Sequence, residues 1–319
     1  MGKCTFSIVI PVFNREREIA KALRSCLGQS FRDFEVLVVD DASTDNSVGA
    51  VQEFLCDARV TLTRIKSNLG EWGARSAGVQ LARGEWIVFL DSDWEFLPDG
   101  LDSMREAVEK NQGEFDRFGF EAIYDDGSRC PLPAISSPVI LDLPGYLRWF
   151  PTTTRSDAVW CAKRETFSRV PLPSGRSGHQ LYACAFNATY RTVLLPGAVC
   201  VMHTDGDNCL TTAGARYDSN SRLAAQAQLA QCEDLLRIYG DAMLQFSPLA
   251  HQRVSRTLVV SSLMAGSRSL AVSNWLRYIR HHRSVESVAL AALIGLGRRG
   301  ATFIRRHRLQ RLARRRAMR

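Results

Sequence analysis

The chain has 319 residues, of which 45% are hydrophobic and 23% charged, so it is long enough to bury a sizeable core and has the composition of a soluble globular protein. Its nine cysteines are odd in number and form no Cys-x-x-Cys pair, which argues against a zinc site and a disulfide framework and fits a reducing cytosol. The N-terminus has no signal-peptide pattern and no apolar run reaches about 18 residues, so we expect neither secretion nor a transmembrane helix.

The net charge of +8 is distributed unevenly. Residues 298–319 contain ten arginines and no acidic residue, so this Arg-rich tail carries +10 and the rest of the chain sums to −2. The basic character therefore belongs to the tail and not to the globular part.

The first half of the sequence alternates short apolar runs with segments of helical spacing. In chain order, the pattern predicts a strand at 6–13, a helix at 16–26, a strand at 34–41, a helix capped by Ser43 or Thr44 and ending near 55, a strand at 59–65, a helix at 73–82 and a strand at 85–90. Near-continuous apolar strands separated by helices indicate a parallel sheet covered on both faces. We therefore predict an α/β fold with a doubly wound, mostly parallel sheet.

The second half of the sequence is less regular. Residues 115–204 read as strands and proline-containing loops, and we assign them to the acceptor half of the same domain. Residues 218–296 read as helical. The predicted organisation is one domain at 1–210, a helical extension at 211–297 and the tail at 298–319.

Polar residues follow each predicted strand of the first half. Asp91-Ser92-Asp93 follows the strand at 85–90, and the other strand-end segments are Pro11-Val12-Phe13-Asn14, Asp40-Asp41-Ala42-Ser43-Thr44-Asp45 and Asn68-Leu69-Gly70. Ligands of parallel sheets bind at this edge, and paired carboxylates are suited to a hard divalent cation. Because no G-x-G-x-x-G or Walker A pattern is present, a nucleotide would have to be held by side chains.

Each of these residues also has a purely structural interpretation. Asp91 and Asp40 are ordinary caps or turn residues, Phe13 suits a core position, and Arg75 suits a solvated helix face. Their combined occurrence along one predicted edge favours a binding site, in which Phe13 stacks on a base, Asp40 accepts its hydrogen bonds and Arg75 pairs with phosphate.

These segments, together with Gln29-Ser30-Phe31 and Ala74-Arg75-Ser76-Ala77-Gly78, make the chain resemble a family 2 glycosyltransferase of the GT-A fold. The resemblance covers residues 5–110 closely and extends more weakly to about 210. It implies a nucleotide-sugar donor, with Pro11 and Phe13 lining the base pocket, Asp40 binding the base and Arg75 holding the nucleotide. It also implies that Asp91 faces the ribose or a metal and that Asp93 ligates Mg²⁺ or Mn²⁺, which stabilises the departing diphosphate.

The segment Val201-Met202-His203-Thr204-Asp205 resembles a later His-containing segment of the family, which implies that His203 lies near the metal and the diphosphate. A lone histidine is more commonly structural, and that interpretation stays open.

One position departs from the family pattern. Inverting members carry a carboxylate base in a short Gly-acid-Asp segment, and the corresponding residues here are Gly178-His179-Gln180. A neutral histidine can take the proton of the acceptor hydroxyl, so we predict His179 as the base, with Asp157 in reserve. The other interpretation is that His179 is an ordinary loop residue.

The Arg-rich tail suits an anionic membrane surface, to which each basic residue adds about 1 kcal/mol, and the apolar segment 285–296 before it suits an interfacial helix. A solubilising tail and a nucleic-acid-binding tail are the alternatives, and we do not expect nucleic acid as the partner.

Together these observations predict a metal-assisted, inverting transferase that moves a sugar from a nucleotide diphosphate to a glycan or lipid-linked glycan, in the cytoplasm and peripheral to the inner face of the cell membrane. The alternative is a GT-A domain with impaired catalysis that acts as a membrane-docked partner in polysaccharide assembly.

Overall fold

The computed structural model describes the whole chain except residues 1–3, 112, 154–156, 174–177, 204–221 and 298–319. The chain divides into two compact units, Met1–Cys209 and Leu210–Arg319. The first contains all the strands of the described residues, and the second is helical there.

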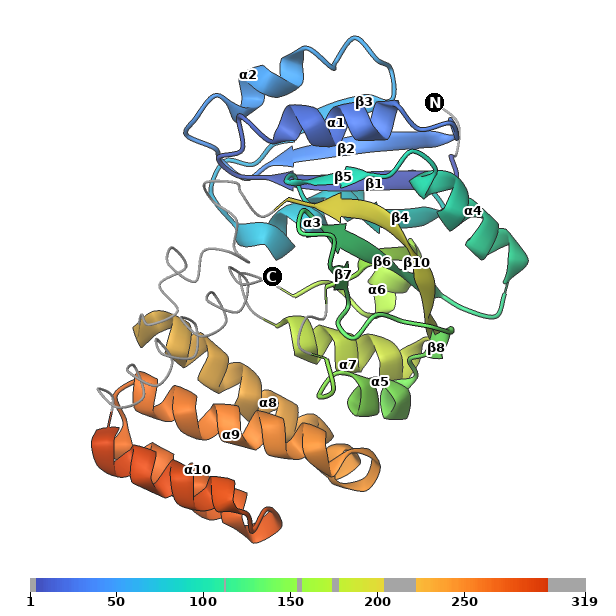
Figure 1. Ribbon diagram of the computed structural model, residues 1–319. Coiled ribbons are helices and arrows are strands. Elements are labelled where there is room, and N and C mark those ends of the chain that lie inside the picture. The colour runs from blue at the N-terminus through green and yellow to red at the C-terminus, as the bar shows by residue number, and fades with distance from the viewer. Residues whose placement is uncertain (1–3, 112, 154–156, 174–177, 204–221, 298–319) are drawn as a thin grey trace. The chain divides into compact units, whose positions relative to one another are not determined.

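The first unit is built on one sheet, in which the described residues form ten strands in the order β3-β2-β1-β4-β9-β6-β10-β5, with β7 and β8 at its margin (Figure 1). The strands are β1 (Phe6–Val12), β2 (Phe34–Asp40), β3 (Val60–Arg64), β4 (Trp86–Phe89), β5 (Trp94–Phe96), β6 (Arg117–Tyr124), β7 (Arg129–Cys130), β8 (Val139–Ile140), β9 (Val159–Lys163) and β10 (Thr192–Met202). The half formed by β3, β2, β1 and β4 is parallel throughout.

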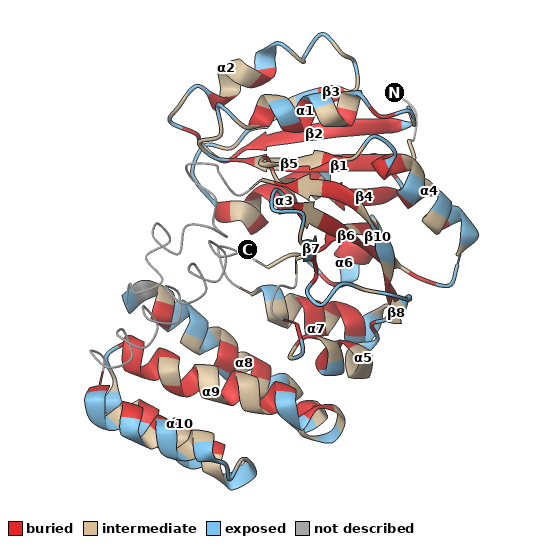
Figure 2. Ribbon diagram, viewed as in Figure 1, coloured by how far each residue is buried: buried red, intermediate tan, exposed pale blue. Residues whose placement is uncertain are grey.

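Helices cover both faces of this sheet. They are α1 (Ile19–Leu27), α2 (Ser47–Gln52), α3 (Gly70–Leu81), α4 (Gly100–Lys110), α5 (Leu143–Trp149), α6 (Thr166–Arg169) and α7 (His179–Thr189). Because successive strand residues point to opposite faces, Ile8 and Ile10 of β1 share one cluster with Leu23 of α1, whereas Val9 lies in another with Phe186 of α7. The central strands are therefore buried on both sides (Figure 2), and the doubly wound α/β prediction is confirmed.

The predicted cap of the second helix is wrong. Its first residue is Ser47, and Asn46 occupies the cap position. Ser43 and Thr44 instead bind the loop after β1, since Ser43 Oγ accepts from Asn14 N at 3.0 Å and Thr44 N donates to Asn14 Oδ1 at 2.8 Å. These bonds join the loops that follow β1 and β2.

The second half of the sheet mixes strand directions. β10 is parallel to β6, whereas β9 is antiparallel to both β4 and β6, and β5 is antiparallel to β10. This half joins the parallel half through the β4–β9 pair. The β10–β5 pair matters for the site, because it aligns Met202 with Trp94, just after Asp93.

The second unit contains α8 (Arg222–Phe246), α9 (Pro248–Met264), α10 (Arg268–His281) and a further helix at residues 285–297. Its core includes Val259 and Leu263 of α9, Tyr278 of α10 and Leu290 of the last helix. Among the described residues, no helix is both long and apolar enough to cross a membrane.

Candidate functional site

The candidate site lies at the carboxyl-terminal edge of the parallel half-sheet. β1 pairs in parallel with both β2 and β4, so the segments that follow these strands emerge at the same edge. Hydrogen bonds continue the alignment there, from Leu90 N to Val9 O at 3.1 Å and from Asp41 N to Val12 O at 2.8 Å. The predicted strand-end residues therefore share one edge.

Phe13 and Asp40 lie at neighbouring strand ends in opposite environments. Phe13 is 40% exposed, so its ring does not belong to the core, and Pro11 in β1 is partly buried. Asp40 is 1% exposed, and its Oδ2 lies 3.1 Å from Arg64 Nε. Its carboxylate also accepts from Ser43 N at 3.2 Å. An exposed ring beside a carboxylate is suited to a planar heterocycle that both stacks and donates hydrogen bonds.

The first turn of α3 is anchored by Asp41, whose carboxylate oxygens accept from Leu69 N at 2.7 Å and Gly70 N at 2.8 Å. Gly70 adopts a φ of 78°, a left-handed conformation that favours glycine. This anchor starts α3 three residues before the predicted position and directs the helix along the sheet edge. Asp41 therefore positions the part of α3 that carries Arg75.

Arg75 joins α3 to the segment after β4. Its Nη2 lies 2.5 Å from Asp91 Oδ1 and its Nη1 lies 2.6 Å from Glu71 Oε1. Burial alone lowers the pKa of Arg75, but the two carboxylates outweigh burial and raise it, so the guanidinium stays charged. Within the described residues its Nε is buried without a hydrogen-bond partner, which leaves one N–H donor for a ligand.

Asp93 is held in an unfavourable electrostatic environment. Burial and the adjacent charge of Asp91 raise its pKa to about 6, although Arg15, at 3.4 Å from Oδ2, acts in the opposite direction. A divalent cation would relieve this repulsion, so the two carboxylates fit the predicted Mg²⁺ or Mn²⁺. The described residues hold no group of three or more His, Cys, Asp or Glu side chains arranged to bind a metal. Substrate phosphates commonly complete the coordination of such ions.

His203 lies beside Asp93 because β10 pairs with β5. Its backbone N donates to Asp93 O at 3.3 Å. Its ring lies between two other carboxylates, with Nε2 at 2.6 Å from Glu95 Oε1 and Nδ1 at 2.6 Å from Asp125 Oδ1. The structure thus places His203 next to the predicted metal-binding segment, with both ring nitrogens in contact with acids that the sequence pattern did not single out.

His179 is the first residue of α7, and its ring packs edge-on against Trp72 of α3 at a centroid distance of 5.5 Å. Part of this side chain is exposed to solvent. The protein atoms packed around the ring disfavour its charged form and lower its pKa to about 4, and the positive charges of Arg75 and Arg117 lower it further. The imidazole is therefore neutral at pH 7 and lies on the same side of the domain as Arg75.

Asp157 precedes β9, and its Oδ2 accepts from Tyr124 Oη at 3.4 Å. The negative charge of Asp157 also acts on Glu71, where it disfavours the ionised carboxylate. Arg75 favours ionised Glu71, but burial and the charges of Asp91 and Asp157 outweigh that effect and raise the pKa of Glu71. Asp157 therefore also borders the group formed by Glu71, Arg75 and Asp91.

Sequence reasoning missed Glu71, Arg15, Glu95 and Asp125. Glu71 has a sequence signal, since it precedes Arg75 by four residues on a helix and so lies on the same face. The other three have none, because their partners are brought to them by strand pairing and by the loop after β1.

Comparison with known proteins gives a family for this domain. The model of glycosyl transferase family 2 matches residues 7–160. Succinoglycan biosynthesis protein ExoO of Rhizobium meliloti (strain 1021) is 40% identical over 103 residues, which are 32% of this chain and 29% of that protein. The UDP-Glc:alpha-D-GlcNAc-diphosphoundecaprenol beta-1,3-glucosyltransferase WfgD of Escherichia coli is 35% identical over 117 residues, which are 37% of this chain and 46% of that protein. The chain spans less than half the length of these curated relatives.

Solved structures agree on the fold. TarS residues 1–349 of S. aureus, in complex with UDP-GlcNAc, gives a TM-score of 0.58 at 18% identity, covering 87% of this chain and 90% of that one. The mannosyltransferase PcManGT of Pyrobaculum calidifontis, in complex with GDP-Man and Mn²⁺, gives 0.54 at 19% identity, covering 95% and 84%. These likenesses show a shared GT-A architecture. The chain therefore carries a glycosyl transferase family 2 domain at residues 7–160.

Proposed function

We propose that this protein transfers a sugar from a nucleotide diphosphate to a glycan or lipid-linked glycan, with metal assistance and inversion at the anomeric carbon. The observation that carries the proposal is the single sheet edge that presents Asp40 and Asp91, the latter paired with Arg75 of α3, within a family 2 domain. The donor complexes of TarS and PcManGT and the names of ExoO and WfgD support the reaction class.

In this proposal the donor lies along the strand ends. Phe13 and Pro11 contact the base, and the Asp40 carboxylate accepts its hydrogen bonds. Arg75 binds the diphosphate, for which it offers a charged guanidinium and the unused N–H at Nε. Asp91 and Asp93, with His203 beside them, would hold Mg²⁺ or Mn²⁺, which when bound stabilises the negative charge of the leaving diphosphate.

Inversion requires a group that takes the proton from the acceptor hydroxyl. His179 is neutral at pH 7 and borders the Arg75 and Asp91 group, which supports it as the base. Asp157 borders the same group through Glu71 and is the second candidate. Because a base with a pKa of about 4 accepts protons weakly at neutral pH, we expect modest turnover if His179 is the base.

We place the acceptor at a membrane surface. The curated relatives include one protein named for succinoglycan biosynthesis and one named for transfer of glucose to a diphosphoundecaprenol-linked sugar, which supports a peripheral location on the inner face of the cell membrane. The predicted tether, the Arg-rich tail at 298–319, lies outside the described residues. Its composition supports anionic lipid as the partner.

The direct test is incubation of the full chain with UDP-, GDP- and dTDP-sugars and Mn²⁺, with measurement of donor binding and of slow donor hydrolysis. We expect one nucleotide class to bind and to be hydrolysed only with the metal. Absence of binding to every donor would refute the proposal. Tight binding without hydrolysis or transfer would instead favour the impaired, membrane-docked domain.

A further inference from the structure

The helix at residues 285–297 presents an apolar face to solvent. Val285 is 88% exposed, Val288 68% and Leu296 63%. Its exposed positions, which recur at helical spacing, are Val285, Val288, Ala289, Ala292, Gly295 and Leu296. The opposite face packs into the unit's own core through Leu290 and Leu293. An exposed helix face that carries only apolar residues is typical of an interaction surface.

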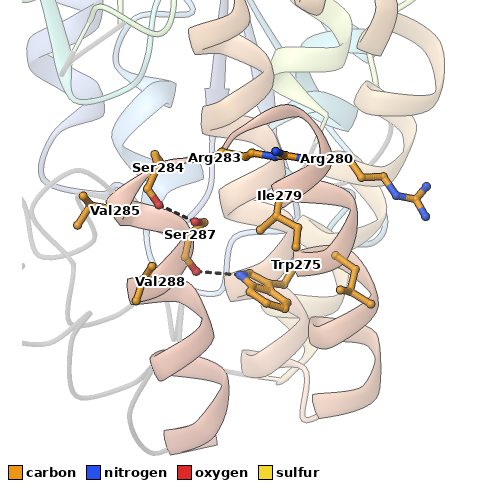
Figure 3. Close-up of a pocket in the computed structure, with 9 residues that line it drawn as sticks. Trp275, Ile279, Arg280, Arg283, Ser284, Val285, Ser287 and Val288 are labelled. Atoms are coloured by element: carbon orange, nitrogen blue, oxygen red, sulfur yellow. Dashed lines mark hydrogen bonds between the residues drawn. The ribbon is translucent and has the colours of Figure 1, made fainter.

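This face continues into an open groove of about 990 Å³ against α10. Figure 3 shows Trp275 and Ile279 of α10 on one side of the groove and Val288 on the other. Trp275 Nε1 donates to Ser287 O at 2.8 Å, so the two helices are fixed to each other at this point. Leu276, which also lines the groove, is 47% exposed. The apolar surface is thus part of a defined two-helix structure.

The charges around this surface are almost all positive. The described residues 268–297 contain four arginines and one acidic residue, Glu286. Glu286 is neutralised within the unit, since it accepts from Arg256 Nη1 at 2.9 Å and from Tyr278 Oη at 2.9 Å. Arg280 and Arg283 line the groove itself and are exposed. A partner for this region must therefore be both apolar and anionic.

We propose that the apolar face of 285–297 and the adjoining groove dock on an anionic phospholipid bilayer. Val285, Val288 and Leu296 enter the boundary between headgroups and acyl chains, and Arg280 and Arg283 bind lipid phosphates. The exposed helix face carries only apolar side chains, and the exposed charges of the groove beside it, Arg280 and Arg283, are positive, which favours an anionic lipid. The proposal rests on the membrane association proposed above and assigns it to a described surface as well as to the tail.

The test is co-sedimentation of the full chain with vesicles of phosphatidylcholine alone or mixed with phosphatidylglycerol, without donor or acceptor. We expect binding to the mixed vesicles only. Val288→Asp should reduce it about tenfold, as expected for the loss of one buried valine. Arg280→Gln and Arg283→Gln should each reduce it about fivefold. Ile238→Asp, which replaces an exposed apolar residue of α8, is the matched control and should bind like the wild type.

Because Val285 and Val288 are exposed, these variants should retain the wild-type thermal unfolding transition, and Val285→Asp provides an independent second replacement. Binding that depends on residues 298–319 but is unchanged by both valine variants would overturn the proposal, as would equal binding to neutral vesicles. A dimer in sedimentation velocity that Val288→Asp dissociates would assign the face to a second copy instead. Since no sugar chemistry is involved, these outcomes are independent of the donor-binding test.

Discussion

At the scale of single residues, the Asp93 carboxylate lowers the stability of the fold when it is ionised, although the same charge suits it to bind a cation. Its pKa of about 6 exceeds the ordinary value of 3.8, so between these pH values the unfolded state loses a proton that the folded state keeps. The free energy of unfolding therefore falls as pH rises through this window, by about 3 kcal/mol in total. A cation bound between Asp91 and Asp93 would recover part of that cost.

We predict that Asp93→Asn raises the free energy of unfolding of the metal-free protein by about 1–2 kcal/mol at pH 8, since it removes the ionised carboxylate but also the contact with Arg15. The gain should vanish below about pH 3, where the wild-type group is protonated in both states. Urea unfolding at the two pH values measures it, with exposed Asp99→Asn as control. An equal gain at both pH values would contradict this. The variant should also lose Mn²⁺-dependent donor binding.

His179 should control proton transfer without controlling donor affinity. We predict that His179→Ala lowers kcat for transfer by about 10²- to 10⁴-fold with little change in donor Kd. Because the pKa of His179 is about 4 and the base must be neutral, wild-type activity limited by this group should be constant above pH 5 and fall below it. If instead Asp157→Asn abolishes transfer while His179→Ala does not, Asp157 is the base.

At the scale of elements, α3 is the part of the fold that determines the position of Arg75. It packs closely on β1, and a Cβ built on Gly78 would lie 2.3 Å from Val9 Cγ1. Strand and helix can therefore approach this closely only with glycine at this point. Asp41 anchors the other end of the helix. Together they bring Arg75 within reach of Asp91.

We predict that Gly78→Ala destabilises the protein by about 1–3 kcal/mol through overpacking and weakens donor binding through displacement of Arg75. Gly240 in α8 is the matched control, because its Cβ would meet nothing within 4 Å. Gly240→Ala should stabilise its helix by about 0.5–1 kcal/mol. Thermal unfolding and donor titration measure both effects. If Gly78→Ala left the free energy of unfolding unchanged, α3 would have to move away from β1 without loss of stability.

At the scale of the whole molecule, charge is segregated between a slightly acidic body and a tail of +10. We predict that binding to phosphatidylglycerol-containing vesicles falls steeply when ionic strength rises from about 0.1 M to 1 M, where the Debye length shortens to about 3 Å. Donor binding should change much less, because the Asp40 and Arg75 contacts are buried. Parallel titrations with vesicles and with nucleotide measure both. A salt-insensitive association would argue against an electrostatic tether.

The sequence was sufficient for the elements up to β4 and for the class of fold. It missed α4, and between residues 115 and 204, where strands and loops were predicted, it missed α5, α6 and α7. Apolar runs of strand length marked β1, β2 and β4, and the helical spacing of Ile19, Leu23 and Cys26 marked the face of α1 that is buried. Because parallel neighbours end at the same edge, the order of elements was also enough to group Phe13, Asp40 and Asp91. The ends of helices were less accurate, since Ser43 and Thr44 bind Asn14 across the sheet edge and do not cap α2.

In the first half of the domain, the sequence by itself determined which segments are strands, which helix faces are apolar and which strand ends carry acids, because these properties depend on the local sequence and its periodicity. Only the tertiary structure decided that His203 lies beside Asp93 with its ring between Glu95 and Asp125, and that His179 packs on Trp72. These contacts depend on the antiparallel β10–β5 pairing and on the packing of α7 against α3. Strand pairing and helix packing join residues from 78 to about 110 positions apart in the chain, separations over which periodicity carries no information.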